Sequence, residues 1–187
     1  MRMANPITRR AERARRTLAG EAGLSKDDFT YLYQGQLRHV FNYVRYRLDA
    51  REAEDVTADI FSRAWAGRRS YDPAKGTPST WLWAIARNVV TDWLRRRRPV
   101  YVQLSSEPGD SSNPLGELTR EEELRQVRAA LLQLPPLDQE IIALRFGAGH
   151  TNRTIAALTG LSEANVAQRL RRALRKVRIR LQGDDSA

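Results

Sequence analysis

Two segments of the chain combine side-chain types that suit contact with nucleic acid. The first, TWLWAIARNVVTDWLRRRRP, interleaves tryptophans with basic and amide side chains and is joined to the loop SYDPAKGTPST, which contains two prolines and a glycine. Aromatic and basic side chains beside a flexible loop suit unstacked, single-stranded bases. At helical spacing, the side chains that can face a strand are Arg87, Asn88, Thr91 and Arg95. The segment therefore indicates a surface for single-stranded nucleic acid.

The second segment, TNRTIAALTGLSEANVAQRLRRALRKVR, predicts a helix-turn-helix. Gly160 lies in the turn TGL, where a left-handed backbone conformation is needed, and Ser162 opens the second helix. The small core that fixes the crossing angle is expected to contain Ile155, Ala156, Leu161, Val166 and Leu170. The second helix of such a motif can enter the major groove, where Asn and Gln pair with adenine and Arg with guanine. The outward side chains available for these contacts are Asn165, Gln168, Arg169 and Arg172.

The composition excludes several kinds of active site. The chain has no cysteine and only two histidines, His39 and His150. A disulfide scaffold, a structural zinc site and a cysteine nucleophile are therefore excluded. The acidic residues lie on predicted helix faces or in a linker, and they form no carboxylate cluster of the kind that metal-dependent phosphoryl transfer needs. We expect neither a metal nor a cofactor, and no enzymatic activity.

The net charge of +10 favours a polyanionic partner. Of the 32 basic residues only Lys26, Lys75 and Lys176 are lysines, and the rest are arginines, whose planar fork suits phosphate oxygens and guanine edges. The basic charge is interrupted by segment 99–119, which holds acidic residues and no basic one. This segment is rich in Pro, Gly, Ser and Asp or Asn and lacks helical periodicity, so it is expected to be a flexible acidic linker.

Helical periodicity covers both segments that flank the linker, and no stretch of any length alternates as a strand does. The predicted fold class is all-α, with two small helical domains. The expected helices are 29–48, 51–66, 80–98, 119–134, 138–147, 152–159 and 162–181, the fifth of them capped by Asp138. In the third helix, the stripe expected to face the core is Trp81, Ile85, Val89 and Trp93.

The predicted domain boundaries follow from these elements. They are a basic, flexible extension over 1–28, a first module over 29–98, the linker over 99–118, a second module over 119–182 and a tail over 183–187. No apolar run approaches the roughly 18 residues that span a bilayer, and the basic amino terminus lacks the apolar stretch of a secretory signal. We therefore expect a soluble, cytoplasmic protein without membrane insertion.

Taken in order, these motifs resemble the extracytoplasmic-function sigma factors, RNA polymerase sigma factors that have regions 2 and 4 only. The run YDPAKGTPSTWLWAIARNVVTDWLRRR looks like regions 2.3 and 2.4 of that family, and the preceding AREAEDVTADIFSRAW resembles region 2.2. LPPLDQEIIALRF and the helix-turn-helix after it resemble region 4. The resemblance spans about residues 29–182, with the linker where the family has one.

The resemblance implies a sigma factor that binds core RNA polymerase and directs promoter-specific initiation of transcription. Its first module would dock on the clamp helices of the β′ subunit, with contacts from Glu54, Asp55, Asp59 and Arg63. The same module would recognise and melt the −10 element. The residues implied for the −10 element are Lys75, Gly76, Thr77, Ser79 and Thr80 in the loop, and Arg87, Asn88, Thr91, Asp92 and Arg95 on the helix that follows.

The second module would bind the −35 element as duplex and grip the β flap of the polymerase. The residues implied for the −35 element are Arg153, Ser162, Asn165, Gln168, Arg169 and Arg172. The linker would thread through the polymerase towards the RNA exit path. Many relatives are held inactive by an anti-sigma factor, which is a further partner that the resemblance implies.

Two other functions fit parts of the sequence. A stand-alone helix-turn-helix regulator would bind duplex DNA without polymerase, but the helix WLWAIARN beside a proline–glycine loop has no role in such a protein. A nuclease or recombinase with a helix-turn-helix tail would need converging carboxylates or a placed nucleophile. Neither feature is evident, so initiation of transcription is the favoured function.

Overall fold

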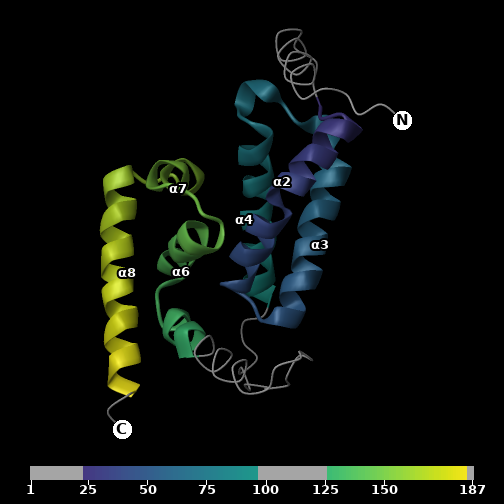
Figure 1. The fold of residues 1–187 in the computed structure, drawn as a ribbon. Coiled ribbons are helices and arrows are strands. Elements are labelled where there is room, and N and C mark those ends of the chain that lie inside the picture. Colours follow the sequence, from purple (N-terminus) through teal and green to yellow (C-terminus); the bar gives the residue numbers. More distant parts are fainter. Residues whose placement is uncertain (1–22, 97–125, 185–187) are drawn as a thin grey trace.

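A computed structural model describes residues 23–96 and 126–184, and within these ranges every regular element is helical. The elements of the first module are α2 (Lys26–Arg45), α3 (Ala50–Gly67), η1 (Arg68–Ser70), η2 (Pro73–Lys75) and α4 (Pro78–Arg96). Those of the second are a helical stretch over 126–132, α6 (Pro136–Ile142), η3 (Ala143–Gly147), α7 (Asn152–Thr159) and α8 (Glu163–Asp184). The all-α fold class is confirmed for the described residues (Figure 1). Most of the predicted amino-terminal extension, the linker and the end of the tail lie outside them.

Short polar side chains set the starts of the long helices. Each cap places a side-chain oxygen where it accepts the backbone N–H three residues further on, which is worth about 1 kcal/mol per helix. These caps are Ser25 for α2, Asp49 for α3, Thr77 for α4, Thr151 for α7 and Ser162 for α8. Because Thr77 caps α4 and Pro78 takes its first position, that helix begins earlier than the predicted residue 80.

Two details at the edges of the modules differ from the sequence prediction. Asp138 does not cap α6, which begins at Pro136 after Pro135, because a proline at the first position already has the helical backbone angle. The first module also starts before residue 29. The Gly23 N–H donates to the carbonyl of Tyr71 at 2.7 Å, and the backbone N–H of the buried Leu24 donates to a backbone carbonyl at the start of η1.

The core of the first module lies between α2, α3 and α4. Its fully buried side chains include Val40, Tyr43, Val56, Ile60, Leu82, Trp83 and Val90. Of the predicted α4 stripe, Val89 is buried, whereas Trp81, Ile85 and Trp93 are only partly buried against the core. The deepest positions, Leu82, Trp83, Ala86 and Val90, lie elsewhere on the helix. The reason is that α4 is covered on two sides, by its own module and by the second one.

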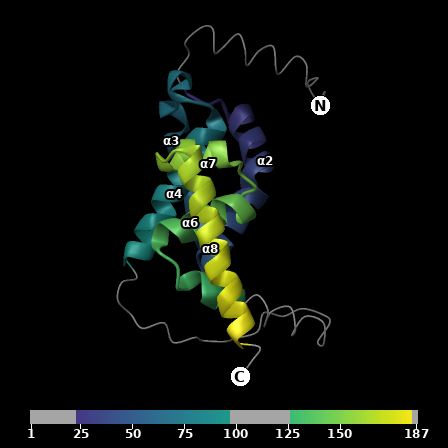
Figure 2. The same ribbon diagram turned by 90° about the vertical axis from the view of Figure 1, so that its left-hand side faces the viewer.

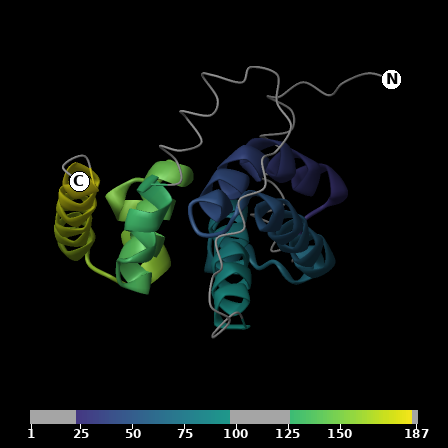
Figure 3. The same ribbon diagram turned by 90° about the horizontal axis from the view of Figure 1, so that it is seen from below.

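The two modules pack directly against each other. The second module lies beside α2 and α4, with α3 on the far side and α8 as the outermost helix (Figures 1 and 3). The Trp83 and His150 rings meet edge to face with centroids 4.4 Å apart, and Arg87 pairs with Glu140 at 2.6 Å. The backbone of Gly147 lies against Asn42 and Tyr43 so closely that an added Cβ would be 3.0 Å from both residues. The described parts of the chain therefore form one body.

Burial at this interface lowers the pKa of His150 from 6.5 to about 4, with a smaller contribution from the charge of His39. The neutral ring is therefore favoured in the folded state. Its contribution to stability is complete above pH 6.5 and is lost as the pH falls towards 4.

We expect the free energy of unfolding to decrease between pH 7 and pH 4.5, and His150→Phe, which keeps a ring against Trp83, to reduce that dependence. Urea unfolding at a series of pH values measures both slopes. His39→Gln should keep most of the wild-type dependence, because desolvation is the larger cause. Equal slopes for wild type and His150→Phe would contradict the assignment.

Candidate functional site

The loop between α3 and α4 is held in a defined conformation by its own side chains. The Tyr71 hydroxyl donates to the carbonyl of Gly76 at 2.7 Å, and the backbone N–H of Ala74 donates to Asp72 at 2.9 Å. Gly76 has φ 145° and ψ −178°, a conformation that only glycine adopts readily. These contacts hold the backbone of the loop in one conformation, with Ala74 and Lys75 exposed to solvent.

The loop brings together the residues that the sequence analysis implied for contact with the −10 element. The hydroxyls of Thr77 and Thr80 lie 2.9 Å apart at the start of α4, and both residues are exposed. The Lys75 side chain is 84% exposed, and its ammonium lies 3.7 Å from the Asp72 carboxylate. Because the pair is open to water, the carboxylate restrains the ammonium only weakly. Ser79 is half-buried beside them. The arrangement offers hydroxyl groups and one exposed ammonium to a polar, anionic ligand.

The predicted strand-facing stripe of α4 is divided by the structure. Asn88, Thr91 and Arg95 are exposed, and Asp92 lies 3.5 Å from Arg95 at the edge of the same surface. Arg87 is not part of this open surface, because its Nε donates to Glu140 of α6 and only 24% of its side chain is exposed. The sequence could not show this pairing, since the partner lies 53 residues away in the other module.

The helix-turn-helix forms as predicted. Gly160 has φ 73° and ends α7, Ser162 caps α8, and the buried residues between the helices are Ile155, Val166 and Leu170. The outer face of α8 lies in front of the rest of the molecule, away from the first module (Figure 2). Gln168 and Arg172 are exposed on this helix, and Arg153 is exposed on α7.

Arg169 is the exception among the predicted contacts of α8. Its Nη1 donates to Asp138 of α6 at 2.8 Å, and its Nε is buried without a hydrogen-bond partner. The Asp138 side chain is 12% exposed and that of Arg169 34%. In this position Arg169 fastens α8 to α6 and does not project with Arg172. Asn165 is half-buried at the start of the same helix.

The predicted acidic face of α3 is exposed. Glu54 and Asp55 project to solvent one turn before Asp59, which accepts a hydrogen bond from Arg63 at 2.8 Å. That bond and the charge of Asp59 raise the pKa of Arg63 above its usual value. Both partners are open to water, so the pair orients Arg63 more than it stabilises the helix.

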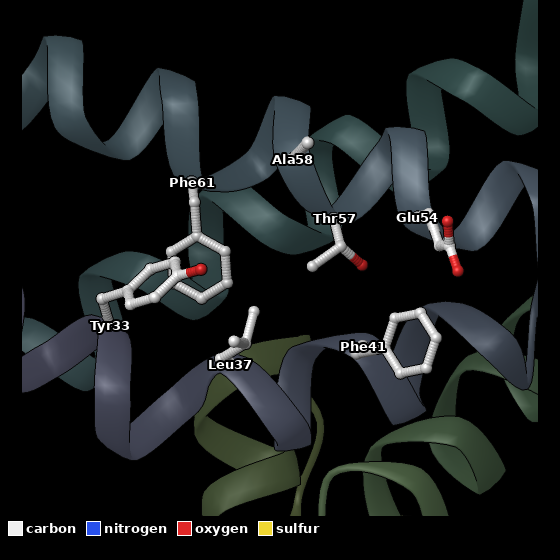
Figure 4. A pocket seen from close by; sticks show the side chains of 7 residues that line it. All are labelled: Tyr33, Leu37, Phe41, Glu54, Thr57, Ala58 and Phe61. Carbon is white, nitrogen blue, oxygen red and sulfur yellow. The ribbon is translucent and has the colours of Figure 1, made fainter.

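A shallow apolar groove lies beside this acidic face, between α2 and α3 (Figure 4). Its volume is about 270 Å³, and it is lined by Tyr33, Leu37, Phe41, Glu54, Thr57, Ala58 and Phe61. Tyr33 and Leu37 remain 38% and 36% exposed, with the Tyr33 ring edge-on to Phe61 at 4.8 Å. Tyr33, Leu37 and Phe41 recur at helical spacing in the sequence, and this spacing alone does not reveal that part of the stripe stays open. An apolar groove with an acidic rim suits a protein partner.

Two kinds of site are not found among the described residues. No group of three or more His, Cys, Asp or Glu side chains there could hold a metal ion. No described helix is both long and apolar enough to cross a bilayer.

Comparison with known proteins gives matches over both modules. Residues 32–100 match the family model of sigma-70 region 2, and residues 124–177 match that of sigma-70 region 4. The ECF RNA polymerase sigma factor EcfG of Rhodopseudomonas palustris is 31% identical over 137 residues, which cover 69% of this chain and 71% of that protein.

Two further likenesses agree with these matches. The probable RNA polymerase sigma factor RfaY of Xanthomonas campestris is 34% identical over 140 residues, 70% of this chain, and the chain spans only 34% of that protein's length. A solved structure of CnrH in complex with the cytosolic domain of CnrY has a TM-score of 0.66 at 24% identity and covers 91% of this chain and 96% of CnrH. At that identity the structural likeness supports the fold alone.

The loop conformation can be tested with a pair of glycine substitutions. Gly76→Ala should lower the free energy of unfolding by about 1–3 kcal/mol, because alanine is strained at this φ. Gly35→Ala is the matched control. Gly35 lies in the middle of α2 with open space where a Cβ would be, so the same change should raise stability by about 0.5–1 kcal/mol. Urea unfolding measures both, and effects of the same sign would contradict the loop geometry.

Proposed function

The chain belongs to the extracytoplasmic-function sigma factors, and we propose that it binds core RNA polymerase and directs promoter-specific transcription by melting the −10 element and binding the −35 element. The observation that carries this proposal is that one chain combines two different surfaces whose side chains suit contact with DNA. One is an exposed polar loop that leads into α4, a helix with aromatic and basic side chains. The other is a helix-turn-helix whose second helix, α8, has an exposed face. A stand-alone duplex-binding regulator needs only the second device and is not favoured.

The loop and α4 would act on the −10 element. A base that leaves the DNA stack needs hydrogen-bond partners and a surface that replaces stacking. The loop offers Lys75, Thr77, Ser79 and Thr80, held in place by the Gly76 turn and the Thr77 cap. Asn88, Thr91 and Arg95 continue the polar surface along α4, on which the displaced strand would lie.

The second module would read the −35 element from the amino-terminal part of α8. Gln168 and Arg172 are one turn apart on its exposed face, and Asn165 lies about one turn before Gln168. Arg153 projects from α7 and is placed to contact the phosphate backbone. Because Arg169 is held by Asp138, we assign base reading to Gln168 and Arg172 and a positioning role to Arg169.

The acidic face of α3 and the apolar groove beside it would bind the polymerase. Glu54 belongs to both, since it lies on the exposed face and also lines the groove (Figure 4). A combination of exposed apolar side chains with negative charge on a basic molecule fits a protein surface better than DNA. A protein with this function would act in the cytoplasm, where promoters and polymerase are found. The function would require no catalytic residue in this chain.

Two substitutions should separate the two binding functions. Arg172→Ala should lower initiation at promoters that depend on the −35 element by about 10- to 100-fold, with core polymerase affinity unchanged. Asp55→Lys should lower affinity for core polymerase by about tenfold or more. Run-off transcription measures initiation, and fluorescence anisotropy with labelled protein measures polymerase binding.

The matched controls are Arg38→Ala and Asp27→Lys, which make the same charge changes on exposed positions of α2. Both should leave initiation within about twofold of wild type. If Arg172→Ala and Asp55→Lys fail at the same step, the division of roles between the modules is wrong. If the wild-type chain with core polymerase yields no start sites on genomic fragments, the proposed function is wrong.

A further inference from the structure

The chain enters the first module beside the loop that precedes α4. The backbone N–H of Gly23 donates to the carbonyl of Tyr71 at 2.7 Å, and the buried Leu24 donates through its N–H to the backbone at the start of η1. The Tyr71 hydroxyl donates in turn to the carbonyl of Gly76 in the loop. The start of α2 and the loop lie at the same end of the module (Figure 1). The segment 1–22 is therefore joined to the fold next to the residues proposed for the −10 element.

The backbone of Gly23 fixes this entry point. Its φ is 98°, a conformation that side chains other than glycine rarely adopt. A Cβ there would be 3.0 Å from the carbonyl oxygen of Arg69 and 3.2 Å from its Cα, so the chain passes directly against η1. Ser25 then caps α2. Because Gly23 and the residues after it are held, the segment 1–22 starts from one place on the surface, with the exposed Arg69 beside it.

The composition of the segment 1–22 suits phosphate groups. It contains six arginines, two glutamates and no lysine, which gives a net charge of +4. Five of the six arginines lie within residues 9–16. A guanidinium binds phosphate oxygens through parallel N–H groups, and such contacts carry no sequence information. Arg69 at the entry point and Lys75 in the loop are exposed cations that continue the basic charge towards the −10 site.

The acidic face of α3 is a second surface to which a basic segment could bind, but it lies further away. Glu54 and Asp55 are near the start of α3, whereas the entry point is beside η1, which follows Gly67 at its end. Asp55 and Gly67 are separated by about 18 Å along the helix. A DNA strand on the loop would lie next to the entry point. The position of the entry point therefore favours DNA over the acidic face.

The segment is long enough to follow the DNA that adjoins the loop. Fully extended, the seven residues from Arg16 to Gly23 reach about 24 Å, and the fourteen from Arg9 reach about 48 Å. The major groove of B-form DNA is about 12 Å wide. The arginines can therefore meet phosphates on both sides of a groove while Gly23 stays at η1.

We propose that residues 1–22 form a DNA-binding arm, which begins at Gly23 and, together with Arg69, binds the phosphates of the duplex that adjoins the −10 element. The arm contributes affinity and does not read sequence, because its charged groups meet only the backbone of the DNA. The proposal rests on the proposed function, since the −10 strand at the loop brings that duplex to the entry point.

The salt dependence of binding measures the phosphate contacts without polymerase. The probe is a fluorescein-labelled duplex of about 20 base pairs and random sequence, titrated with the full chain and followed by anisotropy. Each arginine that neutralises a duplex phosphate adds about 0.9 to the slope of log affinity against log salt concentration. The test variant carries glutamine in place of five arginines, which are Arg9, Arg10, Arg13, Arg15 and Arg16. Its slope should be shallower by about 3 to 4, and its affinity at about 0.15 M salt should be tenfold lower or less.

Arg69→Ala tests the described part of the site. It should make the slope shallower by about 1, as expected for the loss of one phosphate contact. Arg38→Ala removes the same charge from an exposed position further along α2 and is the matched control. It should leave the slope unchanged. Equal slopes for wild type and the five-arginine variant would overturn the proposal.

A variant with the residues of the arm in a different order separates charge from a fitted surface. Reordering residues 1–22 keeps their composition and net charge but breaks up the helical spacing of Ile7, Ala11, Ala14 and Leu18, which would suit the apolar groove beside α3. The reordered variant should bind the duplex and core polymerase as wild type does. Weaker duplex binding, or tighter binding to core polymerase, would assign the arm to the groove and overturn the proposal.

The place of the arm on DNA is measured in the holoenzyme. The chain has no cysteine, so Thr8→Cys carries a single iron chelate that cleaves nearby DNA. On a promoter found by run-off transcription, this chelate should cleave the duplex beside the −10 element, whereas a chelate on Ala157→Cys of α7 should cleave near the −35 element. Cleavage from Thr8→Cys that is absent or confined to the −35 region would overturn the arm. An absence of start sites is failure of the proposed function, and the salt slopes of the free chain are measured independently of it.

Discussion

The indole of Trp83 is the contact through which most of the molecule is positioned. It is 1% exposed, and its Nε1 donates to Gln36 of α2 at 3.1 Å, which satisfies the polar group that a buried tryptophan carries. Its ring meets Tyr43, two turns further along α2, and His150 in the second module. The register of α2 against α4 and the place of the chain before α7 therefore depend on one side chain. The positions of the loop before α4 and of the helix-turn-helix after His150 depend in turn on this side chain.

Local signals were sufficient for the helix-turn-helix. Its turn needs a left-handed residue and supplies Gly160, its second helix needs a cap and has Ser162, and its core residues repeat at helical spacing. Each requirement is met within a few residues of the chain, so the pattern could be interpreted without the rest of the fold. The start of α4 was not predicted in this way, because its cap Thr77 lies before the predicted residue 80, and the backbone conformation of Gly76 was not predicted either.

Periodicity failed where a helix is buried on more than one side. In α4 it selected Trp81, Ile85, Val89 and Trp93, but the second module covers a further face and makes Trp83 the most buried tryptophan. In α2, Tyr33, Leu37 and Phe41 recur at helical spacing, and the groove beside α3 leaves them partly open. Both observations have one cause. A hydrophobic stripe shows that a face is covered or used, and it does not identify the partner, which can be another module or another protein.

Two of the arginines that were predicted to contact DNA are instead bound by acidic side chains of helix α6. Asp138 and Glu140 are two positions apart, so they project from opposite sides of the helix. Asp138 holds Arg169 of α8, and Glu140 holds Arg87 of α4, so α6 lies as an acidic element between the two helices that are predicted to contact DNA (Figure 3). The two pairs differ in one respect. The bond from Asp138 is internal to the second module, whereas the bond from Glu140 crosses the interface between the modules. Arg169 is thus part of the framework that carries Gln168 and Arg172, and Arg87 is part of the contact that joins the modules.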